Sequence, residues 1–196
     1  MSMFLFFDVE TTGMPRNWKA PVSDTFNWPR MVQIAWQAYD EERLCTDAQE
    51  FIVKPEGWEI PYEAERIHKI STEIAKEEGV DLKGVLQQFA KAIDEAEYII
   101  AHNINFDEKV VGAEFIRKSV DHRLFSSERI CTMQESTYYC KLPGKGDRFK
   151  WPTLSELHQK LFGSRFADAH SAMADTQATA NCFFRLLDIE AIDVLD

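Results

Sequence analysis

The feature that most limits the fold of this chain is an apolar run near its start that ends in two acids. Apart from Asp8, the run Met3–Val9 is aliphatic and aromatic, as expected for a strand buried in the centre of a sheet. Side chains alternate across a strand, so Asp8 and Glu10 point to one face and Val9 to the other. Two carboxylates on one face are either an ordinary solvated strand end or part of a site for a hard divalent cation.

The rest of the chain shows the apolar periodicities of further strands and helices. Strands are predicted at Met31–Tyr39, Gln49–Val53 and Tyr98–Ala101, and Ile130 and Cys131 begin or end another. Helices are predicted at Tyr62–His68, Thr72–Glu78, Leu82–Ala96, from an N-cap at Asn105 to about Lys118, from a cap at Thr153 to Phe162, and over roughly Ser171–Ile189. Three strands followed by alternating helix and strand predict an α/β domain with a mixed sheet. The chain has 196 residues and no repeat or linker, so we expect one domain, residues 1–196.

Composition and charge limit the cellular location of the protein and the ligands that its surface can bind. The early apolar run is too short to cross a bilayer and lacks a basic leader, so we expect a cytoplasmic protein without a membrane partner. The four cysteines form no C-x-x-C pair, which favours reduced, mostly buried thiols over a zinc site. A net charge of -11 argues against a broad basic surface for nucleic acid. Divalent cations bound among clustered acids would still allow a nucleic-acid substrate.

A second group of polar residues lies where the Tyr98–Ala101 strand meets the next predicted helix. This group contains His102, Asn103, Phe106 and Asp107. An aspartate in a first helical turn is stabilised by the helix dipole, so Asp107 has a structural explanation as well as a functional one. His102 is more typical of a satisfied structural histidine, and Phe106 is more typical of the core.

A third group, His170 and Asp175, lies at the start of the last predicted helix. Histidine titrates near neutral pH, which suits a general base, although a surface histidine beside a helix is the commoner case. Asp175 lies early in a helix that otherwise packs, where the dipole again favours a carboxylate. Each of the three groups is therefore weak evidence for a catalytic or metal-binding site when taken by itself.

Together, the three groups resemble one known family. The segments Phe7–Gly13 and His102–Asp107, with His170 five positions before Asp175, resemble the DnaQ-like 3′-5′ exonucleases of the DEDDh type. These include the proofreading nuclease domain of the DNA polymerase III epsilon type. Flanking segments are similar too, namely Val32–Ala35, Ile67–His68, and Trp151–Pro152 with Leu154 and Leu157. The resemblance covers roughly Met3 to Leu187, and the combination of motifs is highly specific.

The resemblance implies a fold, a metal site and a reaction. The fold would be α/β and ribonuclease H-like, with a mixed five-stranded sheet flanked by helices. Asp8, Glu10, Asp107 and Asp175 would hold two Mg²⁺ or Mn²⁺ ions, and His170 would be the general base. The reaction would release nucleoside 5′-monophosphates from the 3′ end of single-stranded or frayed DNA.

The resemblance also implies how the substrate is held. The residues after the first acidic pair would hold the terminal nucleotide, and Gly13 allows close backbone approach, although it is equally typical of a plain turn. The expected substrate-binding residues are Thr11, Thr12, Gly13, His102, Asn103 and Phe106. The basic loop Lys141–Lys150 either contacts strand phosphates or faces water.

Two other functions stay open from the sequence. An oligoribonuclease or RNA-trimming 3′-5′ exonuclease would use the same chemistry, and Thr11 with Thr12 favours the DNA-directed members only mildly. A non-catalytic nucleic-acid-binding module is less favoured, because all five acidic and histidine positions are filled. The expected partner is a DNA or RNA 3′ end. The chain ends at Asp196 directly after its last predicted helix, so we expect a stand-alone enzyme without a polymerase tether, with a surface contact to a polymerase and the oligomeric state left open.

Overall fold

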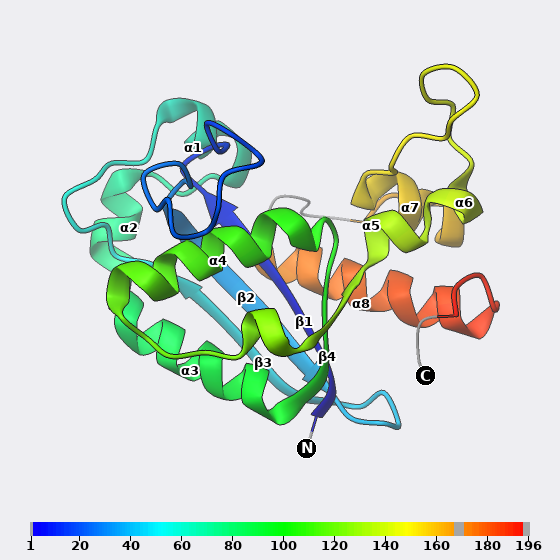
Figure 1. The fold of residues 1–196 in the computed structure, drawn as a ribbon, viewed down its shortest axis with the longest axis horizontal. Helices are drawn as coiled ribbons and strands as arrows, with labels where there is room; N and C mark the ends of the chain where they lie inside the picture. The colour runs from blue at the N-terminus through cyan, green and yellow to red at the C-terminus, as the bar shows by residue number, and fades with distance from the viewer. Residues whose placement is uncertain (1, 167–170, 194–196) are drawn as a thin grey trace.

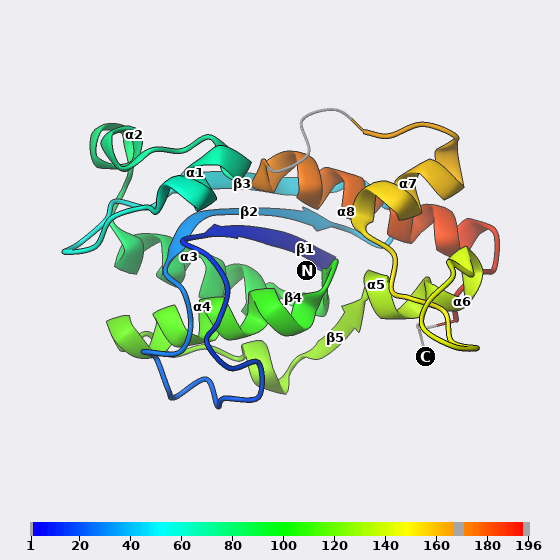
Figure 2. The same ribbon diagram turned by 90° about the horizontal axis from the view of Figure 1, so that it is seen from above.

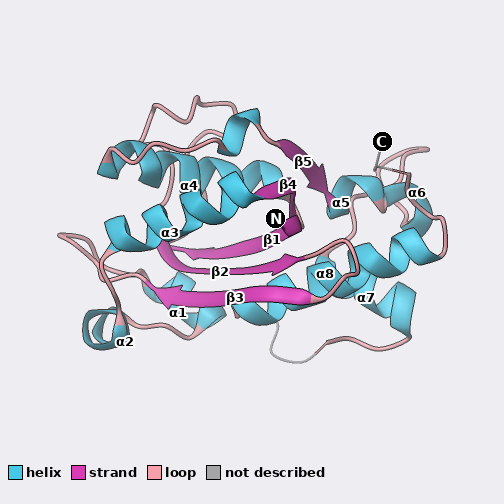
Figure 3. Ribbon diagram, turned by 90° about the horizontal axis from the view of Figure 1, so that it is seen from below, coloured by secondary structure: helices cyan, strands magenta, loops and turns pink. Residues whose placement is uncertain are grey.

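The computed structural model describes residues 2–166 and 171–193, shown in Figure 1. Within these residues, five strands form one mixed sheet in the order β3-β2-β1-β4-β5 (Figure 3). The strands are β1 (Ser2–Thr11), β2 (Met31–Tyr39), β3 (Cys45–Ile52), β4 (Ala96–Ala101) and β5 (Glu128–Cys131). The pairs β1–β2 and β2–β3 are antiparallel, whereas β1–β4 and β4–β5 are parallel. The expected mixed five-stranded sheet is confirmed.

Helices cover both faces of this sheet (Figure 2). One face packs against α3 (Leu82–Glu95) and α4 (Ile104–Lys118), and the other packs against α7 (Leu154–Phe162) and α8 (Ala172–Asp188). The shorter elements are α1 (Tyr62–His68), α2 (Thr72–Glu78), the 3₁₀ turn η1 (Leu124–Ser126), α5 (Thr132–Glu135) and α6 (Thr137–Cys140). The domain is therefore a three-layered α/β structure, as the sequence predicts.

Strand β1 supplies side chains to the core on both faces of the sheet. On one face, alternate residues pack into the cluster beneath α3 and α4: Leu5, Phe7 and Val9. On the other face, the rings of Phe4 and Phe6 lie 5.7 and 5.6 Å from the ring of Phe183 in α8. Because this alternation continues to the end of the strand, Asp8 and Glu10 lie on the face that α8 covers.

Most predicted elements are confirmed, and the differences lie at their ends. The bounds predicted for Met31–Tyr39, Tyr62–His68 and Thr72–Glu78 coincide with those of β2, α1 and α2. β3 begins at Cys45, before the predicted Gln49, because this edge strand is mostly exposed and lacks an apolar pattern. The helix α4 has Asn103, not Asn105, as its N-cap, in a left-handed conformation with φ of 77° that asparagine tolerates.

The burial of the cysteines also agrees with expectation. The cysteines are free thiols, of which Cys131, Cys140 and Cys182 are buried and Cys45 is exposed. This confirms the prediction of mostly buried thiols. In the part of the chain that the structure describes, no helix combines the length and the apolar character needed to cross a bilayer.

Candidate active site

Three of the predicted metal-binding carboxylates converge at the end of β1. Asp8 and Glu10 from β1 and Asp175 from the first turn of α8 each offer one oxygen, and these oxygens lie within 4.8 Å of one another. All three residues are partly exposed, so the cluster is open to solvent. The convergence follows from the alternation along β1, which directs both of its acids toward the face that α8 covers.

Asp107, the fourth predicted acid, joins this cluster from the first turn of α4 and is buried. Burial is the largest cause of the raised pKa of Asp107, which is about 8. Backbone hydrogen bonds from Asp107 itself and from Val9 partly oppose this shift. Burial also raises the pKa of Asp8 well above its usual range, and the next largest cause is the charge of Asp107. The structure thus brings all four predicted acids into one electrostatic group.

The charge of this group determines what it can bind. Burial, with the charges of Asp175 and Asp107, raises the pKa of Glu10 to about 8. Ionising several such carboxylates together is unfavourable unless positive charge lies among them. Closely spaced carboxylate oxygens are the hard ligands that Mg²⁺ and Mn²⁺ prefer. The donor set of Asp8, Glu10 and Asp175, with Asp107 beside it, therefore fits divalent cations.

We expect the stability of the metal-free protein to fall as the pH rises from about 5 to about 8. In this range the folded carboxyls with raised pKa values hold protons that the unfolded chain has already released, so the free energy of unfolding decreases as the pH rises. A divalent cation would offset this loss by compensating the ionised carboxylates. Mg²⁺ at about 100 times its Kd should raise Tm by roughly 5–10 °C at about pH 8, and by much less at about pH 5.5.

This dependence can be measured by calorimetry at the two pH values, with EDTA or with Mg²⁺. Sodium chloride at matched ionic strength is the control at each pH, because it supplies screening without a divalent cation and its shift in Tm can be subtracted. Equal Mg²⁺-induced shifts in Tm at the two pH values would contradict the expected coupling of cation binding to carboxyl ionisation.

Gln33 and Glu50 hold the first turn of α8, and hence Asp175, in place. No sequence motif marked either residue as functional. Glu50 Oε1 on β3 accepts hydrogen bonds from the Gln33 side-chain amide at 3.0 Å and from the Met173 backbone N–H at 3.3 Å. Gln33 Oε1 on β2 accepts the Ala172 backbone N–H at 3.3 Å. These bonds satisfy N–H groups that a helix start leaves without intrahelical partners. The position of Asp175 therefore depends on the β2–β3 edge of the sheet.

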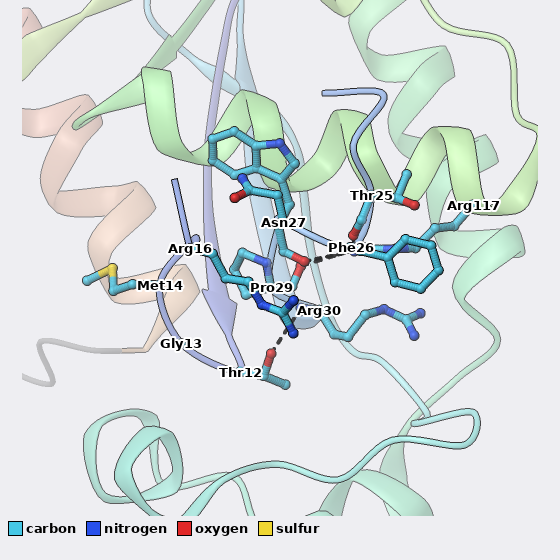
Figure 4. A pocket seen from close by; sticks show the side chains of 11 residues that line it. Thr12, Gly13, Met14, Arg16, Thr25, Phe26, Asn27, Pro29, Arg30 and Arg117 are labelled. Atoms are coloured by element: carbon cyan, nitrogen blue, oxygen red, sulfur yellow. Dashed lines mark hydrogen bonds between the residues drawn. The ribbon is translucent and has the colours of Figure 1, made fainter. Parts of the chain in front are cut away.

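The residues after the acidic pair form a braced turn. Thr11 Oγ1 donates to Gly13 O at 2.8 Å, and Thr12 exchanges two 2.9 Å hydrogen bonds with the Arg30 backbone (Figure 4). Gly13 has a φ of 145° with open space where a side chain would begin, so glycine is required by conformation and not by crowding. Thr12 and Gly13 line a cavity of about 560 Å³ that also contains the exposed ring of Phe26.

A buried ion network holds the far side of this turn. Glu114 on α4 is fully buried and accepts hydrogen bonds from Arg30 Nε at 2.8 Å and from the Met31 backbone N–H at 3.1 Å. Arg117 Nη1 lies 2.8 Å from the same carboxylate, and Arg117 also donates to the backbone carbonyls of Trp28 and Thr25. One carboxylate therefore compensates two arginines and ties α4 to the segment that follows Gly13.

We expect Glu114→Ala to lower the free energy of unfolding by about 3–5 kcal/mol, because it leaves the charges of Arg30 and Arg117 poorly compensated in a partly buried setting. Urea unfolding with an unchanged m-value would measure the loss. The control is Glu95→Ala, which removes an exposed pair with Lys91 at 3.7 Å and should cost less than about 0.5 kcal/mol. A loss below about 1 kcal/mol for Glu114→Ala would show that the network contributes little.

The expected substrate contacts at the start of α4 differ in their geometry. His102 uses both ring nitrogens, with Nδ1 3.0 Å from Thr132 Oγ1 and Nε2 3.0 Å from Pro152 O. Burial lowers the pKa of His102 to about 4, so the ring is neutral at physiological pH. Phe106 packs partly against the core, with its ring 5.7 Å from that of Trp18. These contacts favour the structural interpretation of His102, whereas Asn103 lines an open cavity.

The predicted general base, His170, lies outside the described residues. His68, which sequence analysis treated only as a flanking similarity, lies beside the backbone of Thr11. Burial lowers the pKa of His68, and the Thr11 backbone partly opposes this shift. Its Nδ1 accepts the Ile70 backbone N–H at 3.1 Å. His68 therefore lies next to the end of β1, the strand that carries Asp8 and Glu10.

The fold and the acidic cluster together define an α/β domain with a carboxylate site of the kind that metal-dependent nucleases use. Comparison with protein families assigns residues 5–183 to the RNase_T family, described as exonuclease. The chain belongs to this exonuclease family, which confirms the resemblance found in the sequence. A comparison with curated proteins gave no match.

Solved structures with the same fold include several of exonuclease I. The structure of E. coli exonuclease I with a dT13 oligonucleotide is 23% identical, with a TM-score of 0.74, and the match covers 96% of this chain and 41% of that chain. A zinc-bound E. coli exonuclease I complex with single-stranded DNA is 23% identical, with a TM-score of 0.73, and the match covers 97% of this chain and 41% of that chain. A product-bound exonuclease I is 22% identical, with a TM-score of 0.73, and the match covers 96% and 44%. The chain thus spans about two fifths of the length of these proteins.

Proposed function

We propose that this chain is a metal-dependent 3′-5′ exonuclease that releases nucleoside 5′-monophosphates from the 3′ end of single-stranded or frayed DNA. The observation that carries the proposal is the convergence of carboxylate oxygens from Asp8, Glu10 and Asp175 within 4.8 Å, in a chain of the exonuclease family. The DNA-bound exonuclease I structures of the same fold support DNA as the substrate class.

The proposal assigns a role to each acid and to His170. Asp8, Glu10 and Asp175 would hold the cations, with Asp8 shared between two of them and Asp107 close by. When bound, two such cations lower the pKa of water and stabilise charge on the phosphate and the leaving oxygen. His170 would accept a proton from the attacking water, a task that suits an imidazole near neutral pH.

The residues at the end of β1 would position the terminal nucleotide. The Thr11–Gly13 turn is braced by its own hydrogen bonds and by the Arg30 backbone, so its backbone is fixed before substrate binds. The cavity lined by Thr12 and Gly13 begins directly after the strand that carries Asp8 and Glu10. Fixed backbone near the reacting phosphate reduces the entropy lost on binding, which favours cleavage at a chain end held in one position.

Digestion of end-labelled oligonucleotides tests this function directly. A 5′-labelled single-stranded DNA should give a ladder that shortens from the 3′ end with Mg²⁺ or Mn²⁺, and a 3′-labelled strand should release labelled mononucleotide at once. EDTA should stop both reactions. A matched RNA strand cleaved at least as fast would support the oligoribonuclease alternative, and strand binding without metal-dependent cleavage would support a non-catalytic module.

We also propose that the protein acts in the cytoplasm. The free thiols of all four cysteines are compatible with a reducing compartment. Fractionation of cells followed by immunodetection would test the location, and recovery in an oxidising compartment would contradict it.

A further inference from the structure

Two cavities beyond the acidic cluster share part of their lining and contain an unusual concentration of exposed aromatic rings. The first, of about 410 Å³, lies among Trp18, Asn103, Lys109, Gln134 and Trp151. The second, of about 320 Å³, shares Gln134 and Trp151 with the first and adds Tyr138, Arg148 and Phe149. The two cavities are therefore neighbours on one surface, joined at Gln134 and Trp151.

The aromatic side chains of this surface are exposed although they are large. Trp18 and Trp151 are 50% and 61% exposed, and Tyr138 and Phe149 are 76% and 40% exposed. Large aromatic faces left in water are a recurring feature of surfaces that bind a partner. Tyr138 and Phe149 also meet edge to face at 6.1 Å, which leaves each ring with a free side.

The backbone that carries these rings is fixed, so their exposure is built into the fold. His102 Nε2 lies 3.0 Å from Pro152 O, directly after Trp151, and Thr153 caps α7 through a capping box with Glu156. On the other side, the Lys150 N–H donates to Leu142 O at 3.0 Å, which closes the loop that carries Phe149. These bonds hold Trp151 between two anchored segments.

The charge of the surface indicates what kind of partner it fits. Lys109 lines the first cavity, and Arg148 lines the second beside Asp147. The loop of residues 141–150 carries four basic residues and one acidic residue, in a chain whose net charge is -11. Aromatic faces interleaved with cations are the arrangement that binds single-stranded nucleic acid, because rings stack on bases while cations meet phosphates.

The first cavity lies at the same end of α4 as Asp107. Asn103 lines the first cavity and caps α4, the helix whose first turn carries Asp107. Figure 1 shows α4 beginning beside α5, with the yellow loop of residues 141–150 beyond α6. A strand whose 3′ end lies at Asp8 and Glu10 could therefore continue over Trp18 and Trp151 toward Arg148.

We propose that these two cavities form a strand track that binds the nucleotides on the 5′ side of the terminal one, an inference that rests on the proposed exonuclease function. Trp18 and Trp151 stack on bases, and Lys109 and Arg148 pair with phosphates. Every base has a face that can stack on an aromatic ring, so the track accepts any sequence. The track makes substrate affinity depend on strand length.

The test compares two substrates that differ in how far they extend. The octanucleotide dT8 reaches the track, whereas the p-nitrophenyl ester of thymidine 5′-monophosphate occupies only the terminal site. We expect Trp151→Ala to raise the ratio of the dT8 KM to the ester KM by roughly 5–100-fold, the usual effect of losing one stacking platform. Phe149→Ala should raise the same ratio by a smaller factor, and Arg148→Ala should reduce the salt dependence of the dT8 KM.

The control is Phe125→Ala, because Phe125 on η1 is 39% exposed, like Phe149, and lies outside both cavities. This variant should leave the KM ratio within about twofold of wild type. Circular dichroism and thermal unfolding check that each variant is folded, and Phe149→Ala carries the test if Trp151→Ala does not fold. An unchanged ratio in folded Trp151→Ala and Phe149→Ala variants would overturn the track. If the wild-type protein cleaves neither substrate, the exonuclease proposal fails, whatever the variants show.

Discussion

Replacing Asp8 with asparagine should abolish metal-dependent cleavage while making the metal-free protein more stable. Asp8 lies in the centre of the acidic cluster, within 4.8 Å of oxygens from Glu10 and Asp175 and in electrostatic contact with Asp107. Asparagine keeps the shape but removes the charge that a shared cation ligand supplies. Losing about 4–6 kcal/mol of electrostatic stabilisation of the transition state would slow turnover by roughly 10³–10⁴-fold.

The expected gain in stability follows from the sign of the pKa shift. The pKa of Asp8 is raised by burial and by three neighbouring acids, so the folded state disfavours its charged form. At neutral pH and above, a neutral asparagine avoids this cost. Below about pH 4 the advantage should vanish, because Asp8 is then protonated in the folded and the unfolded chain alike.

Three measurements together distinguish this result from simple misfolding. Turnover of dT8 with Mg²⁺ should be lost, Tm in EDTA at about pH 8 should rise, and the increase in Tm on adding Mg²⁺ should shrink. Asp94→Asn is the matched control, since Asp94 is an exposed acid on α3 whose nearest cation, Arg123, is 4.0 Å away. Turnover equal to wild type in Asp8→Asn would remove this residue from the catalytic site.

Replacing His170 with alanine should slow hydrolysis by roughly 10²–10⁴-fold, the usual contribution of a positioned general base. The prediction rests on the position of His170 five residues before Asp175, in a chain of the exonuclease family. The cation site should stay nearly intact, because its proposed ligands are carboxylates. The variant should therefore keep the Mg²⁺-induced rise in Tm that Asp8→Asn loses.

Single-turnover hydrolysis at saturating Mg²⁺ measures this effect without the contribution of product release. The pH–rate profile should lose the limb that depends on an imidazole, which a purely structural histidine would not change. His122→Ala is the control for removing an imidazole elsewhere, since His122 stacks on Phe115 at 4.2 Å. A full single-turnover rate in His170→Ala would exclude His170 as the base.

Several local features follow from short stretches of sequence. The Thr153 cap of α7, with Glu156 three positions later, is the observed capping box, because both partners lie within one turn. The buried strand Met31–Tyr39 lies where the apolar run predicts it. The four-residue helices α5 and α6 were not predicted, since one turn is too short to show a helical periodicity.

Contacts between distant parts of the chain could not be predicted in the same way. Arg30 and Glu114 are 84 positions apart, and Gln33 and Ala172 are 139 positions apart. Neither contact can be predicted from one segment, because the two partners of each pair lie on separate elements. The surface that joins Trp18 to Trp151 is likewise absent from any single segment.

The sequence by itself determined that Asp8 and Glu10 share one face of a buried strand, and that Asp107 and Asp175 begin helices, because strand alternation and helix dipoles act over a few residues. Only the tertiary structure decided that α8 covers the face of β1 to which those acids point, and that Gln33 and Glu50 hold its first turn there. That arrangement depends on how the apolar faces of the sheet and helices pack. The geometry of the carboxylate cluster is therefore a product of core packing, whereas its residue types come from the sequence.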